Sequence, residues 1–256
     1  MKKLIIILAF VPFIANAQKL LGGKNIIKTN ITGNLIGNYN ITYERALAKK
    51  FSLSVGFRYM PKSTMPQFVK DKVEQLVDDK NVRINEFQMG NFAITPELRL
   101  YLSAGKMKGF YIAPYVRYAS FDMQVPITYD YIPPGSTEKA SALFNGTITS
   151  FSGGLLLGTQ FQIAKKLVLD LWIIGGHYGT SNGTMTVSNF SPAIDKNNSS
   201  QTAGFDKVIN EINNKDYGPF KFKAEVNKPE YTVATITTTG AWAGVRAAGL
   251  SLGLRF

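Results

Sequence analysis

Alternation of apolar and polar residues over stretches of about ten residues is the feature that most constrains the fold of this chain. In "FSLSVGFRYM" (51–60) apolar side chains occupy every second position, and Ser, Gly and Arg occupy the positions between them. Successive side chains of a strand point to opposite faces, so this pattern predicts strands with one apolar face. The same period predicts eight strands, at 25–34, 38–47, 51–60, 90–102, 109–121, 148–163, 167–179 and 241–256.

The connections between the predicted strands are of two kinds. The tripeptide "AKK" separates the second strand from the third and also the sixth from the seventh, whereas 61–89, 122–147 and 180–240 are long. Short turns at one end, long loops at the other and an even number of strands are typical of outer-membrane barrels. We therefore predict an all-β fold, an antiparallel eight-stranded transmembrane β-barrel of the outer membrane with these three long loops outside the cell.

Aromatic residues lie near both ends of the apolar faces, with aliphatic residues between them. The pairs are Phe51 and Tyr59, Phe110 and Tyr118, and Phe151 and Phe161. A membrane barrel carries such aromatic girdles at its two interfaces, whereas a soluble sandwich tends to place its aromatic residues in its core. The pattern favours the membrane barrel.

The beginning of the chain is typical of a secretory signal peptide. Lys2 and Lys3 precede the apolar run "LIIILAFVPFI", and the small residues of "ANA" end at position 17. We predict that 1–17 is cleaved and that 18–256 forms a single barrel domain. Because the chain contains no cysteine, thiol nucleophiles and thiolate metal sites are excluded.

The end of the chain alternates leucine with small or basic residues and stops on phenylalanine. Leu250, Leu252, Leu254 and Phe256 share one face of the last predicted strand. A terminal phenylalanine is favourable at a lipid interface. This segment resembles the C-terminal assembly signal that the barrel-assembly machinery recognises, which makes that machinery an expected partner during biogenesis.

A family resemblance rests on the first five predicted strands. It is carried by "KTNITGNLIGNYNITYERALAKKFSLSVGFRYMP" (28–61), "PELRLYL" (96–102) and "KGFYIAPYVRYASF" (108–121). These segments resemble a family of small outer-membrane barrels from Bacteroidota that is described only as a domain of unknown function and grouped with OmpA-like barrels. The resemblance implies an outer-membrane location and a barrel fold, and it implies no catalytic residues.

Several ionisable residues fall on the predicted inner faces. They are Lys28, Glu44, Arg58, Glu97, Arg99, Arg117, Asp170 and Arg255. The interior of an eight-stranded barrel is just wide enough for side chains, and isolated buried charges are costly. We predict that these groups form an ionic network that closes the lumen. A narrow anion or proton path, favoured by the arginines, is the alternative.

The parts of a known type of outer-membrane enzyme are not evident. The single histidine, His177, lies in "GGHYGTSNG", which we interpret as a polar rim at the loop end of the seventh strand, and no acid is adjacent to it. A lipid hydrolase would need a histidine together with a serine and an acid. We predict no catalytic residues, no metal site and no cofactor.

The long loops are the expected working surface. Val69, Val73, Leu76 and Val77 have helical spacing within 63–81, which predicts a short helix over the barrel mouth or against a partner. The segment 183–239 is polar and rich in Ser, Asn and Thr, so we expect it to be functional or disordered.

The formal net charge of +12 does not indicate a nucleic-acid binder. Segments 61–88 and 183–239 each carry equal numbers of basic and acidic residues, so the excess lies in the strands and tight turns rather than in an exposed patch. We expect outer-membrane lipids as partners, and a surface protein or ligand reached through the loops. The predicted function is non-enzymatic, structural or interactive. The alternatives are a small channel or transporter component, a lipid-modifying enzyme and a soluble periplasmic protein.

Overall fold

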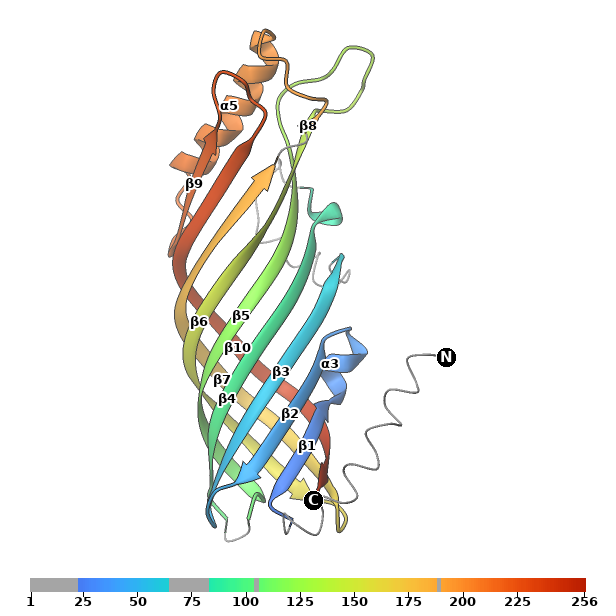
Figure 1. Cartoon of the computed structure of the whole chain (residues 1–256), viewed down its shortest axis with the longest axis vertical. Coiled ribbons are helices and arrows are strands. Elements are labelled where there is room, and N and C mark those ends of the chain that lie inside the picture. The colour runs from blue at the N-terminus through green and yellow to red at the C-terminus, as the bar shows by residue number, and fades with distance from the viewer. Residues whose placement is uncertain (1–22, 65–82, 104–105, 188–189) are drawn as a thin grey trace.

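The structure is a computed structural model that describes residues 23–64, 83–103, 106–187 and 190–256. Its long strands run at a tilt around a closed ring, with one helix at the far end and a shorter one beside the wall (Figure 1). The elements of the ring are β1 (Asn25–Asn30), β2 (Tyr39–Ala46), β3 (Phe51–Thr64), β4 (Gln88–Tyr101), β5 (Gly109–Thr128), β6 (Ser141–Gln162), β7 (Leu167–Val187) and β10 (Ala234–Arg255).

The ring closes because the last strand pairs with the first. Each strand is antiparallel to its neighbours in the order β1-β2-β3-β4-β5-β6-β7-β10, and Ile26 of β1 lies opposite Arg255 of β10. The prediction of an antiparallel all-β fold is therefore confirmed, with eight strands in the ring. A closed ring leaves no continuous open edge, which is why the sheet stays single despite its length.

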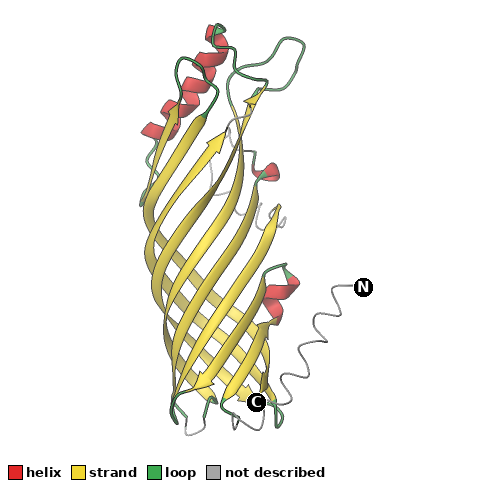
Figure 2. Cartoon of the chain, in the orientation of Figure 1, coloured by secondary structure: helices red, strands yellow, loops and turns green. Residues whose placement is uncertain are grey.

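Several strands are longer than the alternation predicted, and four of them extend far into the expected loops. β5, β6, β7 and β10 continue beyond the ring's shorter strands, so parts of the expected loops 122–147 and 180–240 are strand (Figure 2). The predicted boundaries were wrong here because the apolar face changes sides along these strands, which obscures the alternation. Two further strands join this region: β8 (Phe190–Ser191) pairs with β6, and β9 (Phe220–Val226) pairs with the start of β10.

The helices are α3 (Ile31–Leu35), the 3₁₀ helix η1 (Ile84–Glu86) and α5 (Ser199–Asn214). α3 replaces the end of the predicted first strand, because the Asn30 side chain accepts the Gly33 amide hydrogen at 2.6 Å and caps a helical turn. Within the described ranges, no helix is both long and apolar enough to cross a membrane. The expected helix in 63–81 and the expected signal peptide 1–17 lie outside the described residues.

α5 lies over the end of the ring and is the main element that the sequence interpretation missed. Asn198 caps it by accepting the Gln201 amide hydrogen, and Phe205, Val208 and Ile209 of its apolar face are buried. Gly204 lies so close to the chain at Asp130 that an added Cβ would be 2.5 Å from its carbonyl oxygen. The segment is therefore an ordered part of the fold.

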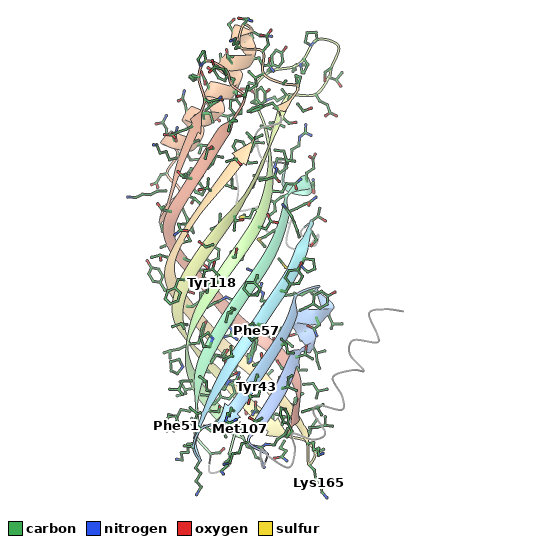
Figure 3. The ribbon with its side chains drawn as sticks, in the orientation of Figure 1. Tyr43, Phe51, Phe57, Met107, Tyr118 and Lys165 are labelled. Atoms are coloured by element: carbon green, nitrogen blue, oxygen red, sulfur yellow. The ribbon has the colours of Figure 1, made fainter. Side chains whose placement is uncertain are left out.

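The two ends of the ring bury opposite kinds of residue. A distal cluster of apolar side chains fills the α5 end; its members include Ile127, Phe144, Met185, Val187, Phe205, Val208, Ala234 and Ile236. Near the short turns the interior is instead largely polar and charged, and large apolar residues are exposed on the outside. Figure 3 shows the side chains along the ring, with Phe51, Met107 and Lys165 at the short-turn end and Tyr118 higher on the wall.

The exposed apolar residues of the outer face form a belt around the ring. This outer belt includes Phe51, Leu53, Phe57, Tyr59, Phe92, Phe110, Ile112, Val116, Tyr118, Phe151, Leu155, Leu157, Phe161 and Tyr178. On β6 it extends from Phe161 to Phe151, and roughly ten residues of a strand tilted by about 40° rise about 25 Å along the axis. Beyond the belt the outer face is polar, as at Thr147, Thr180, Asn182 and Thr184.

Candidate functional site

A buried ionic network occupies the ring interior near the short turns. Its members come from five strands: Lys28, Glu44, Glu97, Arg99, Asp170 and Arg246. The side chain of Lys28 donates hydrogen bonds to Glu44 and Asp170, both at 2.6 Å, and to Gln160 at 2.8 Å. All three partners are 0% exposed, so Lys28 joins three strands inside a dry interior.

Arg99 is the centre of the network. Its guanidinium is fully buried and donates to Asp170 at 2.7 Å, to Glu44 at 3.3 Å and to Glu97 at 2.8 and 3.0 Å. It also lies 4.5 Å above the ring of Tyr111. A planar guanidinium with five donors can satisfy several carboxylates at once, which a single ammonium could not do with the same geometry.

Hydroxyl groups complete the coordination of the buried carboxylates. Tyr101 and Ser52 each donate to Glu44 at 2.6 Å, and Tyr111 donates to Asp170 at 2.7 Å. Buried charges are tolerated when they are both paired and hydrogen-bonded. This arrangement holds strands together across the lumen and leaves no reactive group free among these carboxylates.

The predicted lumen residues do not all enter the network. Lys28, Glu44, Glu97, Arg99 and Asp170 do, whereas Arg255 lies at the short-turn end and donates to Gln162 and to the Lys106 carbonyl. Arg58 and Arg117 line a cavity farther along the interior, and neither forms an ion pair with a described residue. The interior is therefore not completely filled by side chains, contrary to the expectation of a closed lumen.

Arg246 is the network residue that alternation could not find. Counting every second residue back from Leu254 places Arg246 on the outer face, but the pairing of β10 with β7 is interrupted at Ala248, with the same register on both sides. Ala248 has φ +50°, a left-handed conformation, and this irregularity turns the preceding residues over. Arg246 consequently points inward, donates to Glu97 at 2.8 Å and stacks 4.4 Å above Trp172.

The cavity beside these arginines has a volume of about 340 Å³. Its buried part is formed by Thr42, Thr95 and Arg117, which are 3% to 8% exposed. Its rim is formed by exposed residues of α3 and β10, among them Ile36 and Val245. The cavity thus connects the ring interior with the outer surface.

The opening exists because the wall is incomplete next to α3. On one edge β10 pairs with β1 through residues 251–255 and with β9 through residues 234–240. Within the described part of the chain, residues 242–249 have no strand partner on that edge. The short β1–β2 hairpin, ended by α3, covers only part of the length of β3 and β10 (Figure 1). The cavity opens beside α3 between residues of these two strands, and we call this opening the side window.

His177 lies inside the ring rather than at a loop rim, so its predicted position was wrong. β7 continues to Val187, and the Tyr115 hydroxyl is 3.1 Å from His177 Nδ1. No carboxylate contacts this histidine in the structure described, and Ser181 directs its hydroxyl toward the Gly240 carbonyl. No group of three or more His, Asp or Glu residues able to hold a metal ion is present among the described residues.

The predicted assembly signal lies on β10 with its apolar side chains outward. Leu252 and Leu254 are exposed, and Leu250 and Phe256 are partly exposed. Phe256 also continues the strand pairing, because its amide donates to the Asn25 carbonyl at 2.9 Å. The terminal residue therefore takes part in closing the ring.

Comparison with known proteins gives a family and no function. No curated protein matches the chain, and no solved structure does. Residues 3–209 match the model of the family described as "Protein of unknown function (DUF3575)". This match covers most of the chain, including seven of the eight ring strands. The protein therefore belongs to the DUF3575 family of proteins of unknown function.

Proposed function

We propose that this protein is an outer-membrane β-barrel with a non-enzymatic role, presenting an ordered surface outside the cell. One observation carries the proposal: the ring exposes a continuous apolar belt while it buries charges inside. This distribution is the reverse of that in a water-soluble protein, and it is the one that a lipid environment favours. We also propose that the protein is a small barrel of the OmpA-like type found in Bacteroidota, as the sequence resemblance implies.

The dimensions of the outer belt support this environment. A height of about 25 Å matches the apolar band of outer-membrane barrels, and aromatic residues lie at both of its edges. Phe51, Phe110 and Phe161 mark one edge, and Tyr59, Tyr118 and Tyr178 mark the other. We propose that the edge near the short turns faces the periplasm.

The distal end supports a role in surface interaction. Beyond the belt, β7 continues from Tyr178 to Val187, which adds roughly 20–25 Å of wall at the same tilt. This extension contains its own apolar core and is covered by α5, so it forms a rigid surface. Binding residues are often located on loops and caps that a rigid scaffold holds in place.

The interior disfavours a wide channel and a hydrolase. The ionic network crosses the lumen from β4 to β10 through Glu97 and Arg246, and from β4 to β7 through Arg99 and Asp170. His177 has a tyrosine partner and no described acid partner. We therefore propose the interaction role ahead of the channel and lipid-modifying alternatives.

The test combines heat modification with engineered protease sites. A closed barrel resists SDS until heated, so the unboiled protein should migrate differently from the boiled protein. One variant receives a specific protease site after Gly135, in the connection between β5 and β6, and a matched variant receives it after Lys49, in a short turn. We expect cleavage in intact cells only at Gly135.

Two results would contradict the proposal. Release of the protein without detergent, together with no heat-dependent shift, would indicate a water-soluble fold. Cleavage in intact cells after Lys49 but not after Gly135 would reverse the orientation. A conductance in planar bilayers that persists in folded protein would favour the channel alternative instead.

A further inference from the structure

We propose that the side window between β3 and β10 admits an amphiphile whose anionic head group binds Arg58, Arg117 and Arg246. This inference rests on the proposed membrane location. The ligand class is a lipid with a phosphate or carboxylate head group, held by the head inside the ring and by its acyl chains in the surrounding bilayer.

The cavity lies beside arginines whose positive charge is not balanced by nearby carboxylates. Arg246 shares Glu97 with Arg99, but Arg58 and Arg117 have no carboxylate partner among the described residues. Arg117 is 8% exposed and, among the residues that the structure describes, donates only to Thr95, at 3.0 Å; the buried Nε of Arg58 has no hydrogen-bond partner among them. Unpaired cations that are withdrawn from water are costly, so the buried Arg117 and the partly buried Arg58 beside one cavity indicate that an anion completes the site.

The hydrogen-bond donors that line the cavity suit a phosphate or carboxylate group. The cavity is lined by three guanidinium groups and by the polar side chains of Asn40, Thr42 and Thr95. Guanidinium groups bind phosphate and carboxylate through paired hydrogen bonds that are stronger than neutral ones. None of the described residues that line the cavity is acidic. Its volume of about 340 Å³ is at the lower end of the range for small-molecule sites, which suits a head group.

The depth of Arg58 and Arg117 in the proposed membrane also fits a lipid head group. Arg58 lies between Phe57 and Tyr59 on β3, and Arg117 lies between Val116 and Tyr118 on β5. Tyr59 and Tyr118 belong to the aromatic edge of the outer belt on the long-loop side. Aromatic residues of this kind lie at the level of lipid head groups, so the arginines lie behind the wall at head-group depth.

The mouth of the cavity is lined by exposed apolar side chains. Ile36 is 58% exposed and Val245 is 75% exposed, and both line the mouth of the cavity. Leu35 of α3, next to Ile36, is 81% exposed. An apolar rim around a cationic interior fits an amphiphile that enters from the side. A small hydrophilic anion would gain nothing from this rim.

The experiment uses the full-length mature protein in a non-ionic detergent and native mass spectrometry. The probes are dioleoylphosphatidic acid, dioleoylphosphatidylcholine and inorganic phosphate. The test variant is Arg58→Gln/Arg117→Gln. The control, Arg45→Gln/Lys165→Gln, removes the same charge from exposed positions. A third variant, Ala247→Trp, narrows the window without removing an arginine.

We expect the wild-type and control proteins to retain phosphatidic acid in preference to phosphatidylcholine. The double arginine variant should lose this retention by at least about tenfold, because each charge-assisted hydrogen bond contributes strongly to binding. Ala247→Trp should lose the lipid and still bind inorganic phosphate. If the double variant does not fold, Arg58→Gln alone and Ala247→Trp test the same site.

Equal lipid retention by wild type, control and the double variant would overturn the inference. Binding of inorganic phosphate without phosphatidic acid would show a small-anion site reached through the interior, and lateral entry would be wrong. The heat-dependent shift of each sample is recorded in parallel. If the wild type lacks that shift, the membrane proposal itself fails, whereas a normal shift without lipid retention removes only this inference.

Discussion

The short-turn end and the α5 end of the ring use the same strands in opposite ways. Near the short turns, β6 and β7 direct charged and polar residues such as Gln160 and Asp170 inward and leucines outward. Farther along, the same strands direct Phe144 and Met185 inward and Thr147 and Thr184 outward. One continuous strand can therefore bury polar side chains in one segment and apolar side chains in another, because the surroundings of the two segments differ.

This comparison explains what holds each end together. At the short-turn end, lipid would offer the strands no gain from burying apolar side chains inside, so ion pairs and hydrogen bonds specify the interior. At the distal end, water would surround the wall under the proposed membrane location, and the apolar cluster under α5 would supply the usual hydrophobic stabilisation. The predictions below test the difference, beginning with the largest expected effect.

Removing the centre of the ionic network should have the largest effect. We expect Arg99→Met to prevent assembly of the heat-modifiable form, because Glu97 and Asp170 each lose one of their two cationic partners among the described residues. Breaking a buried ion pair costs about 3–5 kcal/mol, a large part of the stability of a domain. The control Arg45→Met changes an exposed arginine. An unchanged urea midpoint for Arg99→Met would show that the network contributes little.

Removing the centre of the distal cluster should unfold only that end. Phe205 is 0% exposed and packs against Tyr129 and Phe190. We expect Phe205→Ala to cost about 3–5 kcal/mol locally and to make α5 sensitive to protease while the heat-dependent shift persists. Asn210→Ala, on the exposed side of α5, is the control. Simultaneous loss of the shift would mean that the two ends unfold as one unit.

An arginine introduced at two heights on the same face of one strand should distinguish a lipid environment from an aqueous one. Leu155 and Thr147 are both exposed on β6, inside and beyond the outer belt. Leu155→Arg should destabilise the protein by about 2–4 kcal/mol in lipid, and Thr147→Arg by close to zero. Unfolding in urea from lipid vesicles measures both. Equal effects of the two substitutions would contradict the proposed membrane location of the outer belt.

The smallest expected effect is a response of α5 to acid. Hydrogen bonds from Lys139 and Lys207 lower the pKa of Asp130 to about 2, from an ordinary 3.8. Because the folded-state pKa is the lower one, this contribution is complete above about pH 4 and is lost as the pH falls toward 2. Amide exchange in α5 should accelerate over that range, and Asp130→Asn should abolish this pH dependence.

Alternation predicted the ring but not its irregularities. The period of two identified eight strands, because outward and inward positions of a wall must differ chemically. It placed Lys28, Glu44, Glu97, Arg99 and Asp170 on inner faces, where the structure joins them. It failed for Arg246, because the turned residue Ala248 changes which positions face inward.

The helices show a second kind of failure. The spacing of Phe205, Val208, Ile209 and Ile212 is helical, but the Ser- and Asn-rich surroundings of these residues suggested an irregular loop. The helix is stabilised because it contacts β9 and its apolar face belongs to a cluster that also includes the ends of β5, β6 and β7, which the sequence places far away. α3, by contrast, is local in origin, since Asn30 caps it where continued strand was predicted.

The sequence by itself determined the repeating strand, the number of strands in the ring and the polarity of most inward positions. These properties follow from local alternation and need no knowledge of neighbours. The tertiary structure alone decided which charges meet, where the strands turn over and where the wall stays open. Those outcomes depend on register between strands distant in sequence, and register is set by the packing of the whole ring.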